Sequence, residues 1–280
     1  MKMLRNVICG LIGLVITCYL LVCCAVMFVP QKFFYEPSEK KSDINHAHVG
    51  EFPAQEVSYQ AEDGTQLMAW FIPAEQGQNT IVFMHGNAGN VENFYPKLKM
   101  FADLGYGIMM PEYRGYGGLE GKITQKNLEK DALAAVRYLQ NLGYQNADMY
   151  IYGMSLGSHM AIHTIYQLQA NGNFAGLILE VPFDSLLNVA KKRVSYLPLD
   201  WIVADKYDNT KIIQNIKSPI LVMGAGQDKI VPIELTKNIF KFAPEPKQIL
   251  IYEQGQHGNL LEYRNDLDIL KWMERNEKGI

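Results

Sequence analysis

The residues most able to do chemistry stand in the run GMSLG, at positions 153–157. Residues 148–152 before it predict a short buried strand, and residues 159–166 after it predict a helix. A serine at a sharp turn from strand to helix is held in a strained backbone conformation, with its hydroxyl raised above the sheet. Glycines two positions before and after it keep side chains out of the crowded turn. The spacing therefore predicts a nucleophile, Ser155, and an ordinary glycine-rich turn is the alternative.

Two residue types that such a serine needs follow the ends of later apolar runs. Asp228 comes just after residues 219–224, and His257 comes just after residues 248–252. In an open α/β sheet, chemistry collects at the carboxyl ends of the strands. A histidine can accept the serine proton, and a carboxylate can orient the ring and stabilise the imidazolium. The order Ser155, Asp228, His257 therefore predicts a catalytic triad.

Other acids and histidines compete for these roles. Asp184 is the rival carboxylate, but with Ser185 it is typical of a helix N-cap, and Asp228 could itself be a turn residue. His159 and His163 are four residues apart and share a helix face. Because no glutamate accompanies them as in an HExxH zinc motif, we interpret them as helix-face residues.

The chain around these residues alternates apolar runs with helical stretches. The runs are residues 80–84, 107–111, 148–152, 176–181, 219–224 and 248–252, and the clearest helix is residues 125–142. This alternation predicts a mostly parallel sheet covered by helices on both faces. Before it, residues 57–60 and 66–72 flank Asp63-Gly64, which predicts an antiparallel hairpin.

Residues 185–215 are longer than a simple crossover and predict a cap over the site. Their apolar members could line an acyl pocket, although a plain packed helix pair is the alternative. These members are Tyr196, Leu197, Pro198, Leu199, Trp201 and Ile202.

Length and composition allow one large core. The chain has 280 residues, 48% of them hydrophobic, and a net charge of −3 that argues against nucleic acid as a partner. The four cysteines, at positions 9, 18, 23 and 24, all precede the predicted domain. No disulfide framework or cysteine metal site is therefore expected there, and we predict no metal and no cofactor.

Residues 7–29 carry no charge and follow Lys2 and Arg5. This segment is long enough to cross a bilayer core of about 30 Å, and it is longer than the apolar part of a signal peptide. We predict an uncleaved signal anchor; a cleaved or lipidated signal and a buried helix are the alternatives. Lysines on both sides leave the orientation undecided, and we expect the domain on the non-cytoplasmic side.

The predicted organisation has three parts. Residues 1–32 are the anchor, residues 33–52 are a linker, and residues 53–280 are the domain with its cap. His46 and His48 in the linker are interpreted as solvated side chains, because no carboxylate or cysteine cluster joins them.

Five short motifs together carry a family resemblance. They are HGNAGN at 85–90, YRGYG at 113–117, GMSLGS at 153–158, GQD at 226–228 and GQHGN at 255–259. Over residues 50–275 the chain resembles the α/β-hydrolase superfamily, and within it the membrane-anchored subgroup of depalmitoylase-like and lysophospholipase-like proteins. The resemblance implies the α/β-hydrolase fold and a serine hydrolase without a cofactor that forms an acyl-enzyme. The N-terminus lacks an acidic or cysteine-rich palmitoylation run, so targeting does not support a protein depalmitoylase.

The motif HGNAGN also suggests how the negative charge on the substrate's carbonyl oxygen is stabilised in the tetrahedral intermediate. In this fold the residue after His-Gly supplies one oxyanion-hole N–H, so Asn87 is predicted to act with the amide of Leu156. His85 is interpreted as structural, bonded to nearby loop backbone. The Arg114 loop lacks the lysine and hydroxyl of a phosphate-binding loop and is interpreted as a tight loop beside the site.

The sequence therefore predicts a membrane-tethered serine hydrolase that cleaves a carboxylic ester or thioester of an acyl or lipid-like substrate. A serine peptidase or amidase is the alternative enzyme. A catalytically silent membrane-anchored binding protein is the alternative from another class.

Overall fold

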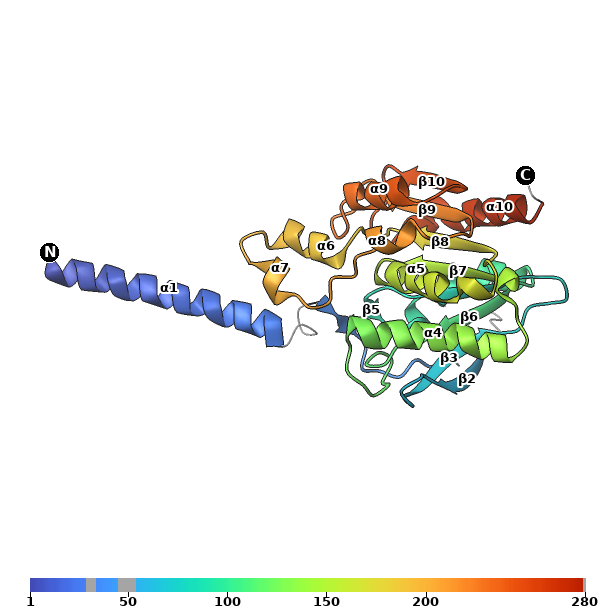
Figure 1. Ribbon diagram of the computed structural model, residues 1–280, viewed down its shortest axis with the longest axis horizontal. Coiled ribbons are helices and arrows are strands. Elements are labelled where there is room, and N and C mark those ends of the chain that lie inside the picture. Colours follow the sequence, from blue (N-terminus) through green and yellow to red (C-terminus); the bar gives the residue numbers. More distant parts are fainter. Residues whose placement is uncertain (29–33, 45–53, 279–280) are drawn as a thin grey trace.

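An eight-stranded sheet lies between two layers of helices, and one long helix projects from the same domain (Figure 1). The computed structural model describes residues 1–28, 34–44 and 54–278. The sheet strands are β2 Gln55–Gln60, β3 Gln66–Ile72, β4 Thr80–Met84, β6 Gly107–Pro111, β7 Met149–Met154, β8 Gly176–Glu180, β9 Ile220–Ala225 and β10 Lys247–Tyr252. The helices are α1 Lys2–Phe28, α3 Lys99–Asp103, α4 Gln125–Asn141, α5 Leu156–Leu168, α6 Leu186–Arg193, α7 Leu199–Ile202, α8 Thr210–Ile213, α9 Ile233–Phe242 and α10 Asn265–Glu277.

The strand order is β10-β9-β8-β7-β4-β6-β3-β2. The six strands from β10 to β6 are parallel to one another, and β3 and β2 join antiparallel. The predicted parallel sheet and its antiparallel opening are both confirmed. The hairpin turn contains Gly64 at φ +82°, a conformation that glycine adopts without steric cost. Short 3₁₀ turns complete the connections: η2 Val91–Asn93, η3 Tyr95–Lys97, η4 Asn146–Asp148, η5 Gln169–Asn171 and η6 Leu260–Tyr263.

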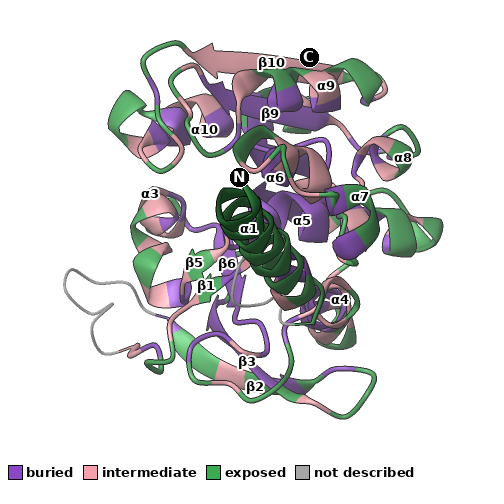
Figure 2. Cartoon of the chain, turned by 90° about the vertical axis from the view of Figure 1, so that its left-hand side faces the viewer, coloured by how far each residue is buried: buried purple, intermediate pink, exposed green. Residues whose placement is uncertain are grey.

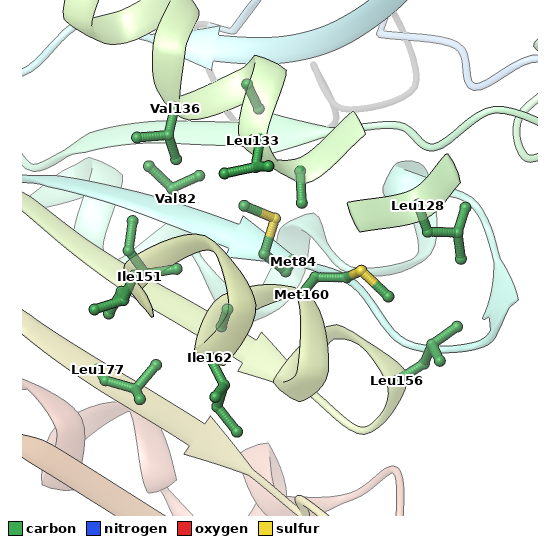
Figure 3. Packing of buried hydrophobic residues seen from close by; sticks show 14 of the residues in the cluster. Val82, Met84, Leu128, Leu133, Val136, Ile151, Leu156, Met160, Ile162 and Leu177 are labelled. Atoms are coloured by element: carbon green, nitrogen blue, oxygen red, sulfur yellow. The ribbon is translucent and has the colours of Figure 1, made fainter. Parts of the chain in front are cut away.

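Alternate side chains of the strands fill two cores, one on each face of the sheet. On β4, Val82 and Met84 pack into the core under α4 and α5, whereas Ile81 and Phe83 pack into the core under α3 and α10. Figure 3 shows the first of these cores, with Met84 of β4 near Met160 of α5. Because the central strands are buried on both faces, they appear in the sequence as continuous apolar runs.

The helix α1 is long, and most of its surface is not covered by the rest of the protein. Its 27 residues span about 40 Å, and only 6% of its most apolar window is buried. Among the described residues it is the one helix long and apolar enough to cross a membrane, by length and composition. Its C-terminal end contacts α7, and Figure 2 looks along α1 onto this side of the domain.

The described part of the predicted linker packs onto the domain. Its residues form β1, Glu36–Pro37, which pairs in parallel with β5, Ala88–Gly89. The Tyr35 hydroxyl lies 2.6 Å from that of Tyr207 in the cap segment. His46 and His48 lie outside the described residues.

A buried arginine joins the hairpin to α4. Arg114 donates from Nη2 to Asp131 at 2.6 Å and from Nη1 to Asp63 at 2.9 Å, and the Arg114 and Asp131 side chains are 5% and 1% exposed. Burial raises the pKa of Asp131 above its usual value, although the bonds from Arg114 act to lower it. The ionised pair depends on the guanidinium remaining in place.

We expect Arg114→Met to lower the free energy of unfolding by about 3–5 kcal/mol, because Asp131 would keep a buried and unpaired charge. Lys99→Met is the control. Lys99 and Asp103 form an exposed pair, with side chains 38% and 52% exposed, whose loss should cost at most about 1 kcal/mol. Urea denaturation of the detergent-solubilised chain measures both. Equal transition midpoints for the two variants would contradict the assignment.

Candidate active site

The predicted strand, turn and helix meet at Ser155. This residue follows β7 directly, has φ 51° and ψ −116°, and precedes the first residue of α5. A positive φ is rare for a residue with a side chain, so the turn is strained. The Ser155 N–H donates to Glu180 O of β8 at 2.9 Å, which fixes the turn to the neighbouring strand.

The two glycines of the motif are required by contact rather than by their flexibility. A Cβ on Gly157 would lie 1.9 Å from Met84 O at the end of β4. A Cβ on Gly153 would lie 2.4 Å from Gly157 O. Both distances are far inside van der Waals contact, so no other residue fits at either position without moving the helix.

Ser155, His257 and Asp228 lie in one connected chain of contacts. His257 Nε2 is 2.8 Å from Ser155 Oγ, and His257 Nδ1 is 2.7 Å from Asp228 Oδ2. The other carboxylate oxygen, Asp228 Oδ1, accepts the N–H groups of Ile230 and Val231 at 2.7 and 2.9 Å. An ionised carboxylate only accepts, so the proton lies on Nδ1 and Nε2 is free to accept from the serine hydroxyl.

These three side chains differ in exposure in a way that suits proton transfer. The Asp228 side chain is 1% exposed and that of His257 is 16% exposed, while Ser155 as a residue is 7% exposed. The carboxylate is therefore shielded from water, whereas the ring is partly exposed. The arrangement can move a proton from Ser155 Oγ to the ring.

The loop after β4 lies against the serine. A Cβ on Gly86 would be 3.7 Å from Ser155 Cβ, and Asn87 and Leu156 line the same cavity as Ser155. His85 Nδ1 lies 2.8 Å from Gly86 O, as the structural interpretation of His85 predicts. His85 Nε2 approaches Glu112 Oε1 to 3.1 Å, without hydrogen-bond geometry. The oxyanion role of Asn87 and Leu156 stays a prediction.

The rival residues are occupied elsewhere. Asp184 Oδ1 accepts from Ser185 N at 2.6 Å and from Asn188 Nδ2 at 3.1 Å, so Asp184 supports the start of α6. Ser185 is the N-cap itself, since its hydroxyl accepts from Asn188 N. His159 is buried, and its Nε2 lies 2.8 Å from Glu129 Oε1 of α4.

His163 is the second histidine of the helix face and lies beside the same glutamate. Its Nε2 is 3.8 Å from Glu129 Oε2, and burial lowers the pKa of His163. Hydrogen bonds from His159 and Gln125 hold the pKa of Glu129 below its usual value, although burial acts to raise it. Among residues 1–28, 34–44 and 54–278, no group of three or more histidine, cysteine or acidic side chains is arranged to hold a metal ion.

Comparison with known proteins gives the same fold. The family described as serine aminopeptidase, S33, matches residues 75–197. The Mycobacterium tuberculosis protein MT2364, named only as uncharacterized, is 30% identical over 224 residues, covering 78% of each chain. The crystal structure of the alpha/beta hydrolase GrgF from Penicillium superposes with a TM-score of 0.66 at 16% identity, covering 81% of this chain and 99% of that one. The chain belongs to the α/β-hydrolase superfamily.

One further relative of this α/β hydrolase carries a functional name. The lysophosphatidylserine lipase ABHD12 of Danio rerio is 28% identical over 198 residues, which cover 64% of this chain and 51% of the lipase. Membership of the superfamily supports a hydrolase activity for the chain.

The cavity of this α/β hydrolase next to Ser155 has a volume of about 330 Å³ and is mostly apolar. Of the six cap residues for which the sequence leaves an acyl pocket and a packed helix pair as the alternatives, three line it, namely Tyr196, Leu197 and Leu199. Trp201 is 88% exposed instead, and Ile202 packs toward α1. The other lining residues are Val22, Val26, Phe34, Glu36, Asn87, Leu156, Phe183, Leu186, Val189, Ala190, Arg193, Val194, Ile230 and Val231.

Sequence reasoning missed the contributions of α1 and β1 to this cavity. Val22 and Val26 lie inside an unbroken apolar run, where no periodicity distinguishes a cavity wall from a lipid-facing residue. Glu36 belongs to a two-residue strand, which is too short to show alternation.

We expect Gly157→Ala in this hydrolase to lower stability by about 1–3 kcal/mol or more, because the new methyl group overlaps Met84 O. Gly258→Ala is the matched control. It lies beside His257, but a Cβ there meets nothing within 4 Å, so its effect should stay within about 0.5 kcal/mol. Thermal unfolding followed by circular dichroism compares the two. A Gly157→Ala protein as stable as the control would refute the close approach of α5 to β4.

Proposed function

We propose that the protein is a membrane-attached serine hydrolase that cleaves a carboxylic ester or thioester bond of an acyl or lipid-like substrate. The observation that carries the proposal is the contact chain from Ser155 Oγ through the His257 ring to the shielded Asp228 carboxylate, at 2.8 and 2.7 Å. Ser155, His257 and Asp228 are the proposed catalytic triad.

In the proposed mechanism, His257 Nε2 takes the proton of Ser155 as Oγ attacks the carbonyl carbon of the substrate. Asp228 stabilises the imidazolium that forms. The imidazolium then protonates the departing alkoxide or thiolate, which leaves an acyl group on Ser155. A water molecule, deprotonated by the same ring, attacks the acyl-enzyme and releases the acid.

The backbone N–H groups of Asn87 and Leu156 are the proposed oxyanion hole. Negative charge develops on the carbonyl oxygen during both attacks, and each well-aimed donor is worth about 3–4 kcal/mol of transition-state stabilisation. The position of Leu156 at the first turn of α5 adds the partial positive charge of a helix N-terminus.

An apolar acyl group is the best-supported substrate feature. A cavity of about 330 Å³ with mostly aliphatic and aromatic walls lies within the size range of small-molecule sites. The name of the Danio rerio relative, a lysophosphatidylserine lipase, supports the lysophospholipase-like side of the subgroup proposed from the motifs. The exposed apolar surface of α1 supports membrane attachment. The location of the domain on the non-cytoplasmic side stays a prediction from the sequence.

We expect Ser155→Ala to reduce hydrolysis of p-nitrophenyl butyrate to background. Asp228→Asn should lower kcat by about 10³–10⁴-fold, because an asparagine no longer holds the ring in the required tautomer. Asp184→Asn is the matched control and should change kcat far less. The reverse order of the two aspartate variants would reassign the acid, and full activity of Ser155→Ala would reject the nucleophile.

A peptidase or amidase is the second candidate, favoured by the description of the matching family as serine aminopeptidase. Initial rates on acyl esters, acyl thioesters and aminoacyl amides separate the candidates. We expect the ester and thioester to be cleaved faster at equal acyl length; a preference for aminoacyl amides would select the peptidase. A chain that no fluorophosphonate labels at Ser155 would instead be a catalytically silent binding protein.

A further inference from the structure

The cavity beside Ser155 is not closed by the cap alone. Val22 and Val26, in the last two turns of α1, line it together with Ser155 and the cap. In α1, Cys23 and Val26 are the buried residues, at 9% and 4% exposure. The helix that is apolar enough to cross a membrane therefore also forms part of the candidate active site.

The contact between α1 and the cap is specific to one face of the helix. Tyr19, Cys23 and Val26 are spaced four and three residues apart, so they share a face. Tyr19 donates from its hydroxyl to Tyr196 O at 3.0 Å. Cys23 and Val26 pack with a cluster of cap residues, which are Ala190, Leu199, Ile202 and Val203.

The same contact sets the depth of the cap relative to a bilayer. A hydrocarbon core of about 30 Å takes about 20 helical residues. Counted from Val7, the first apolar residue after Arg5, these residues end near Val26. Tyr19 comes seven residues before Val26, so Tyr19 and the cap backbone that it contacts lie about 10 Å inside that end of the hydrocarbon core. Trp201, 88% exposed in the cap, is a residue type that favours the membrane–water interface.

We propose that the last two turns of α1 form one wall of the acyl-binding site, and that the acyl chain of a membrane-resident lipid ester reaches Ser155 from the bilayer between α1 and the cap. This inference rests on the proposed serine hydrolase function. It adds that the acyl chain of the substrate would pass from the bilayer to Ser155 without crossing water, along a lining that is mostly apolar but also includes Glu36 and Arg193.

The first test traces the path that the acyl chain of the substrate takes to Ser155. The full-length protein in phosphatidylcholine vesicles is reacted with a dodecyl fluorophosphonate that carries a diazirine at the end of its alkyl chain. Reaction with Ser155 forms a phosphorus–oxygen bond and releases fluoride. After irradiation and digestion, we expect mass spectrometry to find the alkyl end attached to residues 19–26 or to the cap residues 186–199.

Attachment confined to other parts of the domain would overturn the wall assignment while leaving the hydrolase proposal intact. Absence of any labelling at Ser155 would reject the hydrolase proposal, and this inference with it. The two failures are therefore distinguished by the same sample.

The second test measures acyl-length selectivity. Val22→Trp narrows the cavity from the side of α1, and Val15→Trp is the matched control on the same helix, because Val15 is 68% exposed and does not line the cavity. We expect Val22→Trp to lower kcat/KM for p-nitrophenyl dodecanoate at least about tenfold relative to the acetate, and Val15→Trp to leave the ratio unchanged. An unchanged ratio in Val22→Trp, with labelling at Ser155 retained, would overturn the inference.

Discussion

The close approach of α5 to the end of β4 is the constraint on which the candidate site depends. Gly157 lies so close to Met84 O that a side chain there would push α5 away from β4, and with it the turn in which Ser155 has φ 51°. The hydrogen bond from Ser155 N to Glu180 O also attaches the turn to a third strand, β8. The direction of the serine hydroxyl is therefore set by the backbones of β4, β7 and β8, which are buried along their whole length.

The same helix also holds the cap. His159 Nε2 lies 2.8 Å from Glu129 Oε1 of α4, and its Nδ1 lies 2.7 Å from Asn209 Oδ1, where the chain returns from the cap. Asn209 in turn donates from Nδ2 to Phe183 O at 2.9 Å, at the point where the chain leaves for the cap. Both ends of the cap are thus attached to one buried imidazole on α5. His159, which the sequence indicates only as a helix-face residue, therefore connects the helix that follows Ser155 to the cap.

The sheet and the positions of the three candidate catalytic residues could be predicted, because both follow from short-range signals. Apolar runs give buried strands, and the ends of parallel strands share one edge of the sheet. The partners of His159 could not be predicted, since Glu129 and Asn209 come from distant segments with no local pattern. The sequence leaves open whether Trp201 lines a pocket or packs, and the residue does neither; α7 has only four residues, and so short a helix shows no periodicity that would identify its buried face.

The short ladder between β1 and β5 has a practical consequence. The loop that carries Asn87 is bonded to the chain that follows α1, through Ser38 N to Gly89 O at 2.9 Å and Glu36 N to Asn87 O at 3.4 Å. A truncated form, cut to obtain a soluble domain for crystallisation or screening, would lose the α1 side of the cavity. If the cut fell beyond Ser38, it would also release one edge of this loop. Ligands selected against such a shortened protein would be fitted to a wider and less ordered pocket than the full-length chain presents.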